Sequence, residues 1–384
     1  RVTYDPGAAP MTADTIFDLA SLTKVVATTT VAMTLVDEGR LDLDARVDSF
    51  LPLFVGPNKE KVTVRHLLTH SSGIDWWAPL YREVSGQAAY VERICAMPLV
   101  TEPGTAMKYS DLGIILLGEI LERVAGEPLE TLVRERVTGP LGMRDTVFRP
   151  GPELLARVPP TEADPWRGRL VHGEVHDENA FALGGVAPHA GLFSTAPDLA
   201  RLAQMLLWGG EYDHHRIVAR RTVEEFTRRS TLPPGTDRAL GWDTRSAEGS
   251  SAGTLFSPTS FGHTGFTGTS LWVDPERELF VILLTNRVHP TRENNAIRKV
   301  RPALADTVVR ALADPDEHPA PVVVGLDRVA AGEAPELAGK RLGLLTHAAA
   351  VALDGRRSAE VLRERGLDLV RLYAPEHGIA GRAA

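Results

Sequence analysis

Apolar residues recur with a helical period in six segments of the first 230 positions. In the segment 21–40 they return at helical spacing, which predicts an amphipathic helix. Thr63 is a suitable cap for the run 63–70, and Gly126 is a natural stop after the strongly apolar run 111–124. The same pattern predicts further helices at 129–137, 198–208 and 221–228.

Two other patterns follow along the chain. Residues 145–190 are rich in Pro, Gly, His and Asp and have weak periodicity, so we expect long, organised loops there. The apolar runs 268–273 and 279–285 are separated by the turn-forming segment 274–278, which predicts an antiparallel hairpin. An amphipathic helix at 296–312 closes this part of the chain.

Composition changes sharply after residue 312. The segment 313–323 is dominated by Pro, Asp and Ala and is typical of a linker. Beyond it, a strand at 341–346, a helix at 358–365 and a strand at 369–373 form one β-α-β unit. We therefore expect a first domain at 1–312, a linker, and an incomplete second domain at 324–384.

Overall composition excludes several classes of protein. Apolar residues make up 43% and charged residues 24% of the 384 residues, which are ordinary globular values. Apolar stretches such as 280–284 are much shorter than the roughly 20 residues that span a bilayer, so no transmembrane segment is expected. The net charge of −8 argues against a nucleic-acid partner. A single cysteine, Cys95, excludes an internal disulfide and a multi-cysteine zinc site.

Ser21 and Lys24 are the first candidates for chemistry. Their spacing at the start of a helix places both side chains on one face, one turn apart. The helix N-terminus offers free N–H groups where an oxyanion would form, and a lysine beside positive potential loses its proton more easily. The alternative is that Ser21 only caps the helix and Lys24 lies on the surface.

Two further motifs follow in the chain. Tyr109, Ser110 and Asp111 open the apolar helix, where Ser110 or Asp111 could simply be a cap. The second motif precedes the hairpin and could be an ordinary turn entering a strand; it consists of His263, Thr264 and Gly265.

Together the three motifs resemble those of the serine penicillin-recognising hydrolases, which include class C β-lactamases, D-alanyl-D-alanine carboxypeptidases and family VIII esterases. The order S-x-x-K, Y-S-x and H-x-G agrees over residues 13–312, and the stretches 17–24, 66–73, 191–195 and 262–266 also look familiar. The resemblance implies an α+β fold of the β-lactamase/transpeptidase type. In that fold, helices flank an antiparallel sheet beside a mainly helical subdomain.

The resemblance also implies roles for individual residues. Ser21 would attack an acyl carbon and form an acyl-enzyme, while Lys24 and Tyr109 share the proton transfer. The oxyanion would lie between the backbone N–H groups of Ser21 and Phe266. His263 would face the carboxylate or leaving group of the substrate, with Thr264 and Gly265 beside it. No metal or organic cofactor is implied.

Two departures from the usual motifs change the expected substrate. Asp111 stands where β-lactamases usually carry asparagine, and its charge should raise the pKa of Lys24. His263 replaces the usual lysine and would hold a carboxylate more weakly. We therefore expect small-molecule or peptidoglycan-derived substrates, either D-Ala peptides or carboxylic esters. The alternatives are a β-lactamase and a non-hydrolytic penicillin-recognising sensor. The oligomeric state stays open.

Several other patterns are weaker candidates. The segment 249–253 fits G-x-S-x-G but lacks the strand and helix that a nucleophile elbow requires. His172 and His176 have a metal-like spacing in a loop, and His70 is interpreted as structural. Three aromatic residues could pack against one another or line a pocket: Trp76, Trp77 and Tyr81.

The last part of the chain resembles a different family. The stretches 337–347 and 373–379 look like the start of an exo-β-N-acetylmuramidase domain, in which Glu376 and His377 would belong to the active site. The alternative is a polar strand end in an incomplete domain. Since only 324–384 is covered, we expect no glycosidase activity. The chain opens at Arg1 without a signal-like segment, so we expect missing N-terminal strands and an export signal upstream.

Overall fold

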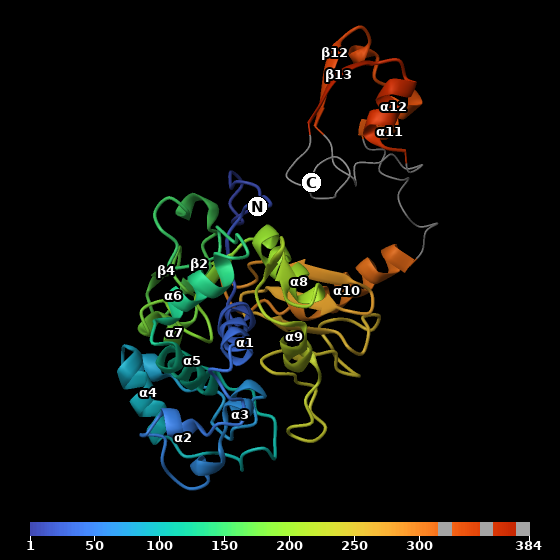
Figure 1. Cartoon of the computed structure of the whole chain (residues 1–384). Helices are drawn as coiled ribbons and strands as arrows, with labels where there is room; N and C mark the ends of the chain where they lie inside the picture. The colour runs from blue at the N-terminus through green and yellow to red at the C-terminus, as the bar shows by residue number, and fades with distance from the viewer. Residues whose placement is uncertain (314–324, 346–355, 374–384) are drawn as a thin grey trace. The chain divides into compact units, whose positions relative to one another are not determined.

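The structure is a computed structural model that describes residues 1–313, 325–345 and 356–373. The chain folds into two compact units, Arg1–Arg310 and Ala311–Ala384. Each unit is described by itself below. The first unit holds the three motifs singled out in the sequence, and its helices and strands are drawn in blue to orange in Figure 1.

The helices of the first unit agree well with the apolar pattern. The first one is wound as a π-helix followed by a regular α-helix, and it ends three residues earlier than expected. A short helix at Gln87–Ala96 is absent from the predictions. The helical elements are η1 (Lys24–Thr29), α1 (Thr30–Asp37), α2 (Val47–Phe50), η2 (Lys59–Lys61), α3 (Val64–Leu68), η3 (Leu80–Arg82), α4 (Gln87–Ala96), α5 (Asp111–Ala125), α6 (Leu129–Val133), η4 (Arg134–Thr138), η5 (Leu155–Arg157), α7 (Glu178–Ala182), α8 (Ala196–Leu207), α9 (Arg220–Thr227) and α10 (Ile297–Ala313).

Caps explain where the two helices nearest the motifs begin. Thr63 caps α3 by accepting a hydrogen bond from the His66 amide, as expected from the sequence. Ser110 caps α5 by accepting from the Gly113 amide at 2.9 Å. Gly126 then ends α5 in the left-handed conformation, where glycine has no steric penalty. The cap at Ser110 fixes Tyr109 and Asp111 on either side of the start of α5.

The main sheet has four antiparallel strands in the order β11-β10-β9-β8. They span β8 (Asp243–Thr244), β9 (Phe261–Thr264), β10 (Ser270–Asp274) and β11 (Leu279–Leu283), so the predicted hairpin is confirmed. His263 lies inside β9, opposite Leu271, and not in a turn before a strand. The α+β class is therefore confirmed.

Alternation along β10 explains the layers around this sheet. Leu271 and Val273 belong to the main apolar core, while Trp272 between them packs with Ala305 and Val309 of α10. Helix α8 packs against β10 and β11. Figure 1 shows α8 and α10 beside the strands, with the mainly helical part on the side of α3 to α5.

Shorter strands complete the first unit. A small sheet of order β1-β5-β2 joins β1 (Phe17–Asp18) to β5 (Leu192–Ser194) and β2 (Val147–Phe148). Two hairpins pair β3 (Ala163–Asp164) with β4 (Arg169–Leu170) and β6 (Glu211–Tyr212) with β7 (His215–Arg216). The expected loop region 145–190 thus contains short strands and α7. The β1–β5 pairing places the segment before Ser21 against a strand from the second half of the unit.

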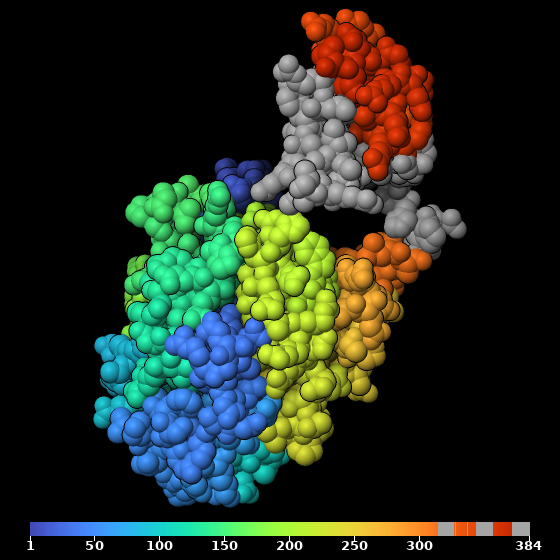
Figure 2. All heavy atoms as spheres, viewed as in Figure 1, coloured from blue at the N-terminus to red at the C-terminus, as the bar shows by residue number. Residues whose placement is uncertain are grey.

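Residues far apart in sequence lie side by side on the surface of this unit. Figure 2 shows the blue first part of the chain against the yellow-green α8–α9 region. At this boundary the Thr222 hydroxyl donates to the Asp37 carboxylate at 2.6 Å. Within the described ranges, no helix combines the length and the apolar character that a membrane-crossing segment needs.

The described part of the second unit contains one β-α-β arrangement, as predicted. Strands β12 (Arg341–Leu345) and β13 (Asp368–Tyr373) pair in parallel, and α12 (Ser358–Glu364) lies between them in sequence. A helix α11 (Gly325–Ala331) and a turn η6 (Pro335–Leu337) precede them. Glu376, His377 and residues 314–323 of the predicted linker lie outside the described residues. The resemblance of this segment to a muramidase therefore stays a prediction.

Candidate active site

The Lys24 ammonium group joins the candidate nucleophile to a carboxylate. Its Nζ atom donates to Ser21 Oγ at 2.9 Å and to the carbonyl of His189 at 2.9 Å, and lies 2.7 Å from Asp111 Oδ1. An ammonium group has three N–H donors, and these three acceptors use all of them. Lys24 is 1% exposed, so the alternative of a surface lysine is wrong.

The charge of Lys24 follows from this environment. Burial disfavours the ammonium form, but the Asp111 carboxylate, with a smaller contribution from Tyr109, outweighs it and raises the pKa of Lys24. The expected effect of Asp111 is therefore confirmed. The expectation that positive potential makes Lys24 lose its proton easily is wrong, because the neighbouring carboxylate dominates.

Tyr109 completes the group around Ser21. Lys24 Nζ lies 5.0 Å from the centroid of the Tyr109 ring. Burial raises the pKa of Tyr109, and this outweighs the opposing effects of Lys24 and of hydrogen bonding to Lys24 and Ser21. The phenol is thus neutral at neutral pH, and its ring lies beside the Lys24 ammonium group.

Two backbone amides are free to bind an oxyanion near Ser21. Neither the Ser21 nor the Phe266 amide donates a hydrogen bond within the described part of the chain. The residue before the nucleophile, Ala20, has a φ of 47°, a strained conformation for a residue with a Cβ. The Ala20 amide donates to Asp18 Oδ1 at 2.8 Å, which holds this turn in place.

Two threonines fasten the Phe266 loop to the Ser21 turn. Thr267 Oγ1 donates to the Asp18 carbonyl at 2.7 Å, and Thr269 Oγ1 donates to the Leu19 carbonyl at 2.9 Å. A Cβ on Gly265 would lie 2.3 Å from the Leu19 carbonyl oxygen, so only glycine permits this approach. Neither threonine was predicted from the sequence, although they lie two and four residues after Gly265.

His263 is a buried, neutral side chain. It is 2% exposed, and burial lowers its pKa to about 4 against the opposing effect of Asp243. Nδ1 lies 2.8 Å from the Thr264 carbonyl, and Nε2 has no partner among the described groups. His263, Thr264, Gly265 and Phe266 all line one cavity with Ser21 and Tyr109. A neutral imidazole there supports the expected weak anchoring of a carboxylate.

This cavity opens beside Ser21 and has a volume of about 530 Å³. Strand β8 pairs only with Phe261 and Gly262 of β9, so the end of β9 near His263 has no strand on that side. Five arginine side chains also line the cavity: Arg238, Arg287, Arg292, Arg298 and Arg301. Four of these arginines lie within residues 287–301, but their sequence spacing does not indicate that the side chains share one cavity.

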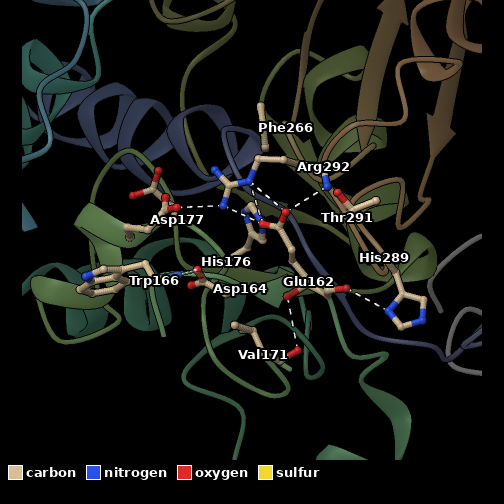
Figure 3. Close-up of polar contacts among 12 residues, drawn as sticks. Glu162, Asp164, Trp166, Val171, His176, Asp177, Phe266, His289, Thr291 and Arg292 are labelled. Carbon is tan, nitrogen blue, oxygen red and sulfur yellow. Dashed lines mark hydrogen bonds and ion pairs between the residues drawn. The ribbon is translucent and has the colours of Figure 1, made fainter. Parts of the chain in front are cut away.

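A buried ionic network supports the same region, and Figure 3 shows Glu162 at its centre, pointing toward His176 and Arg292. Glu162 Oε2 lies 2.8 Å from His176 Nε2 and 2.6 Å from Arg292 Nη2. Burial alone would raise the pKa of Glu162, but hydrogen bonds from His176 and Arg292 outweigh it and hold the pKa at about 2. The His176 ring stacks on Phe266 at 5.8 Å, so the network contacts the residue that carries one free amide.

The weaker candidates have structural roles. His70 Nδ1 accepts from the Ser110 amide at 3.1 Å, and its ring lies 4.6 Å from Tyr109, which supports its structural interpretation. Ser251 Oγ accepts from Trp272 Nε1 in a loop. Among the described residues, no group of three or more potential ligands could hold a metal ion. The rings of Trp76, Trp77 and Tyr81 pack one against the next, and the Tyr81 ring also packs against Trp166.

Comparison with known proteins identifies the family. The chain matches the Beta-lactamase family over residues 1–305. A protein of Escherichia coli (strain K12) named "Putative D-alanyl-D-alanine carboxypeptidase" is 36% identical over 312 residues, which cover 72% of this chain and 70% of the relative. A penicillin-binding protein homologue from Caulobacter crescentus superposes with a TM-score of 0.61 at 23% identity, covering 79% of this chain and 86% of that one.

A class C beta-lactamase superposes with a TM-score of 0.64 at 18% identity, covering 79% of this chain and 84% of that chain. At such identities the structural similarity concerns the fold, while the family match and the E. coli relative extend over the sequence itself. The chain belongs to the beta-lactamase family of serine hydrolases, and it has the fold of the penicillin-binding protein homologues.

Proposed function

We propose that the chain is a serine peptidase that removes the last residue of D-Ala-containing cell-wall peptides through an acyl-enzyme on Ser21. The observation that carries this proposal is the position of Ser21 Oγ, 2.9 Å from Lys24 Nζ and next to two free backbone amides. The name of the E. coli relative supports the choice of substrate. Domain 1–312 would carry the activity.

The proposed reaction has two halves. Ser21 Oγ attacks the peptide carbonyl, and its proton passes through the Lys24–Tyr109 pair to the leaving amine as the C–N bond breaks. Water then attacks the acyl ester, and its proton passes through the same pair to Ser21 Oγ as the ester C–O bond breaks and the peptide acid leaves. In both halves the Ser21 and Phe266 amides stabilise the negative charge on the carbonyl oxygen.

The charge of Lys24 sets the pH dependence of this reaction. Because Asp111 holds Lys24 in the ammonium form, the base is formed only in the fraction of molecules that lose this proton. The activity should therefore rise with pH through the pKa of Lys24.

Two features disfavour efficient β-lactam hydrolysis. Asp111 cannot donate the amide hydrogen bond that asparagine gives, and His263 is uncharged at neutral pH. Carboxylic esters stay a second substrate class because they need the same acyl transfer with a better leaving group. The proposed substrates lie outside the cytoplasm, so we propose that the full-length protein is exported.

The decisive assay measures release of D-Ala from acetylated L-Lys-D-Ala-D-Ala, with a p-nitrophenyl ester and a chromogenic cephalosporin in parallel. We expect D-Ala release by the native chain and none by Ser21→Ala. Ser251→Ala, which alters the rival G-x-S-x-G serine, is the matched control and should stay active. Peptide cleavage that persists in Ser21→Ala, or absence of peptide cleavage by the native chain, would refute the peptidase assignment.

A further inference from the structure

The carbonyl of His189 is one of the three acceptors that hold the Lys24 ammonium group, and the one among them that belongs to the main chain. The backbone around it gives little support. The amides of residues 189–191 donate no hydrogen bond within the described ranges, and Pro188 before them has no amide hydrogen. The position of this carbonyl therefore depends on side chains.

The His189 side chain supplies such support through Asp177. Its Nε2 atom lies 3.0 Å from Asp177 Oδ1, and the imidazole is 1% exposed. Burial would raise the pKa of Asp177, but His189 and the hydrogen bond from the Ala180 amide outweigh it and hold the pKa well below its usual range. Asp177 is therefore a carboxylate, which only accepts hydrogen bonds, so Nε2 of the imidazole is the donor.

Asp177 is itself fixed in place. Its Oδ1 atom also accepts from the Ala180 amide at 2.7 Å and so caps α7. One residue before His189, the Pro188 carbonyl accepts from Thr28 Oγ1 at 2.6 Å. The chain is thus tied to η1 just before His189 and to the start of α7 at His189 itself.

The carbonyl acts on the chemistry when Lys24 gives up a proton. The neutral amine has two N–H groups and one lone pair. If the His189 carbonyl and the Asp111 carboxylate accept from the two N–H groups, the lone pair is left to face Ser21 Oγ, 2.9 Å away. Without the carbonyl, an N–H group is free to turn toward Ser21 and the lone pair points elsewhere. The amine then does not accept the Ser21 proton.

We propose that Asp177 and His189 form a positioning pair for Lys24. Their hydrogen bond holds the His189 carbonyl in the place that directs the lone pair of the lysine amine at Ser21 Oγ. Neither residue lines the cavity beside Ser21, so the pair acts through the lysine and not on the substrate. This inference rests on the proposed function, in which Lys24 takes part in transfer of the Ser21 proton, but not on the identity of the substrate.

The test measures phosphonylation of Ser21 by a fluorophosphonate, a general probe of active serines. Ser21 Oγ forms a bond to phosphorus, its proton passes to Lys24 and fluoride leaves, so the rate requires the base but no peptide. Intact-mass spectrometry at several probe concentrations gives the maximal rate constant, kinact, and the half-saturating concentration, KI. Release of D-Ala from acetylated L-Lys-D-Ala-D-Ala is measured alongside.

Two substitutions of the histidine separate its hydrogen bond from its packing. His189→Met has a similar volume but no donor, and should lower kinact roughly ten- to hundred-fold while KI stays within about two-fold. In His189→Gln the amide nitrogen takes the place of Nε2, so kinact should stay within about three-fold of the native value. The matched control is His172→Met, which removes an exposed histidine bonded to the Val158 carbonyl and should have native kinetics.

The partner residue gives an independent variant. Asp177→Ser keeps a helix cap for α7, but its side chain is one bond shorter and does not reach His189, so its kinact should match that of His189→Met. Because both substitutions break the same hydrogen bond, the double variant should lose no more than either single variant.

An unchanged kinact in His189→Met, an equal fall in His189→Gln, additive losses in the double variant, or no labelling of Ser21 in the native chain would overturn the inference. The expected kinact values without any release of D-Ala by the native chain would instead refute the proposed function.

Discussion

Lys24 Nζ lies 2.7 Å from Asp111 Oδ1, so the lysine that contacts Ser21 is held by a carboxylate that begins helix α5. Substitution of that carboxylate by the isosteric amide, Asp111→Asn, should lower the pKa of Lys24. The neutral, proton-accepting form then appears at lower pH. The rising limb of kcat/KM against pH should move to lower pH by roughly one to three units.

The control for this substitution is Asp75→Asn. Asp75 forms a comparable ion pair, with Lys108 at 2.7 Å, but it is partly exposed and does not contact Lys24. Its pH profile should stay that of the native chain. An unchanged limb in Asp111→Asn would mean that Lys24 does not supply the titrating group.

The hydroxyls of Thr267 and Thr269 should be needed for the chemical step. Thr267→Val or Thr269→Val keeps the side-chain shape but removes the bond to the Asp18 or Leu19 carbonyl. The two oxyanion amides would lose their fixed spacing, so kcat should fall roughly ten- to hundred-fold with little change in KM. Thr307→Val, which removes a similar bond on exposed α10, should have native kinetics. A change confined to KM would contradict this role.

Glu162 should contribute stability that depends on its ionisation. Its pKa is lowered from 4.5 to about 2, so the contribution is complete above about pH 4.5 and is lost as the pH falls through 2. Glu162→Gln removes the charge and leaves Arg292 less well paired, which should lower the free energy of unfolding at pH 7 by about 3 kcal/mol. Urea unfolding measures this change.

The pH dependence of unfolding separates this effect from a simple packing defect. Between pH 5 and pH 2 the native chain should lose more stability than Glu162→Gln, because the variant has no carboxyl to protonate there. Glu174→Gln, which removes a surface ion pair with Arg169, should have the same free energy of unfolding as the native chain at both pH values. An equal loss of unfolding free energy between pH 5 and pH 2 in the native chain and in Glu162→Gln would refute the ionic role of Glu162.

Local signals in the sequence were sufficient for most helices and for the three motifs. The caps Thr63 and Ser110 and the stop at Gly126 act over a few residues, so the bounds of α3 and α5 could be predicted. The effect of Asp111 on Lys24 could also be anticipated, because the family resemblance brought both residues to one site. These helices could be predicted because the interactions that set their bounds join residues within one or two turns.

Long-range contacts explain what the sequence could not predict. Glu162 and Arg292 are 130 residues apart in the sequence, so no local pattern indicates that they pair. The positions of His172 and His176 indicated only a metal-like spacing, from which the contact of His176 with Glu162 could not be predicted. Four of the five arginines that line the cavity lie close together in the sequence, within residues 287–301, but no local pattern shows that their side chains reach the cavity.

Acylation of Ser21 is the step on which the proposed function depends. Intact-mass spectrometry of the native chain, quenched during turnover of a p-nitrophenyl ester, with peptide mapping of the adduct, detects it directly. We predict one acyl group on the peptide that contains Ser21, absent from Ser21→Ala and present in Ser251→Ala. An adduct on any other residue, or turnover with an unlabelled Ser21 under conditions that trap acyl-enzymes, would contradict this prediction.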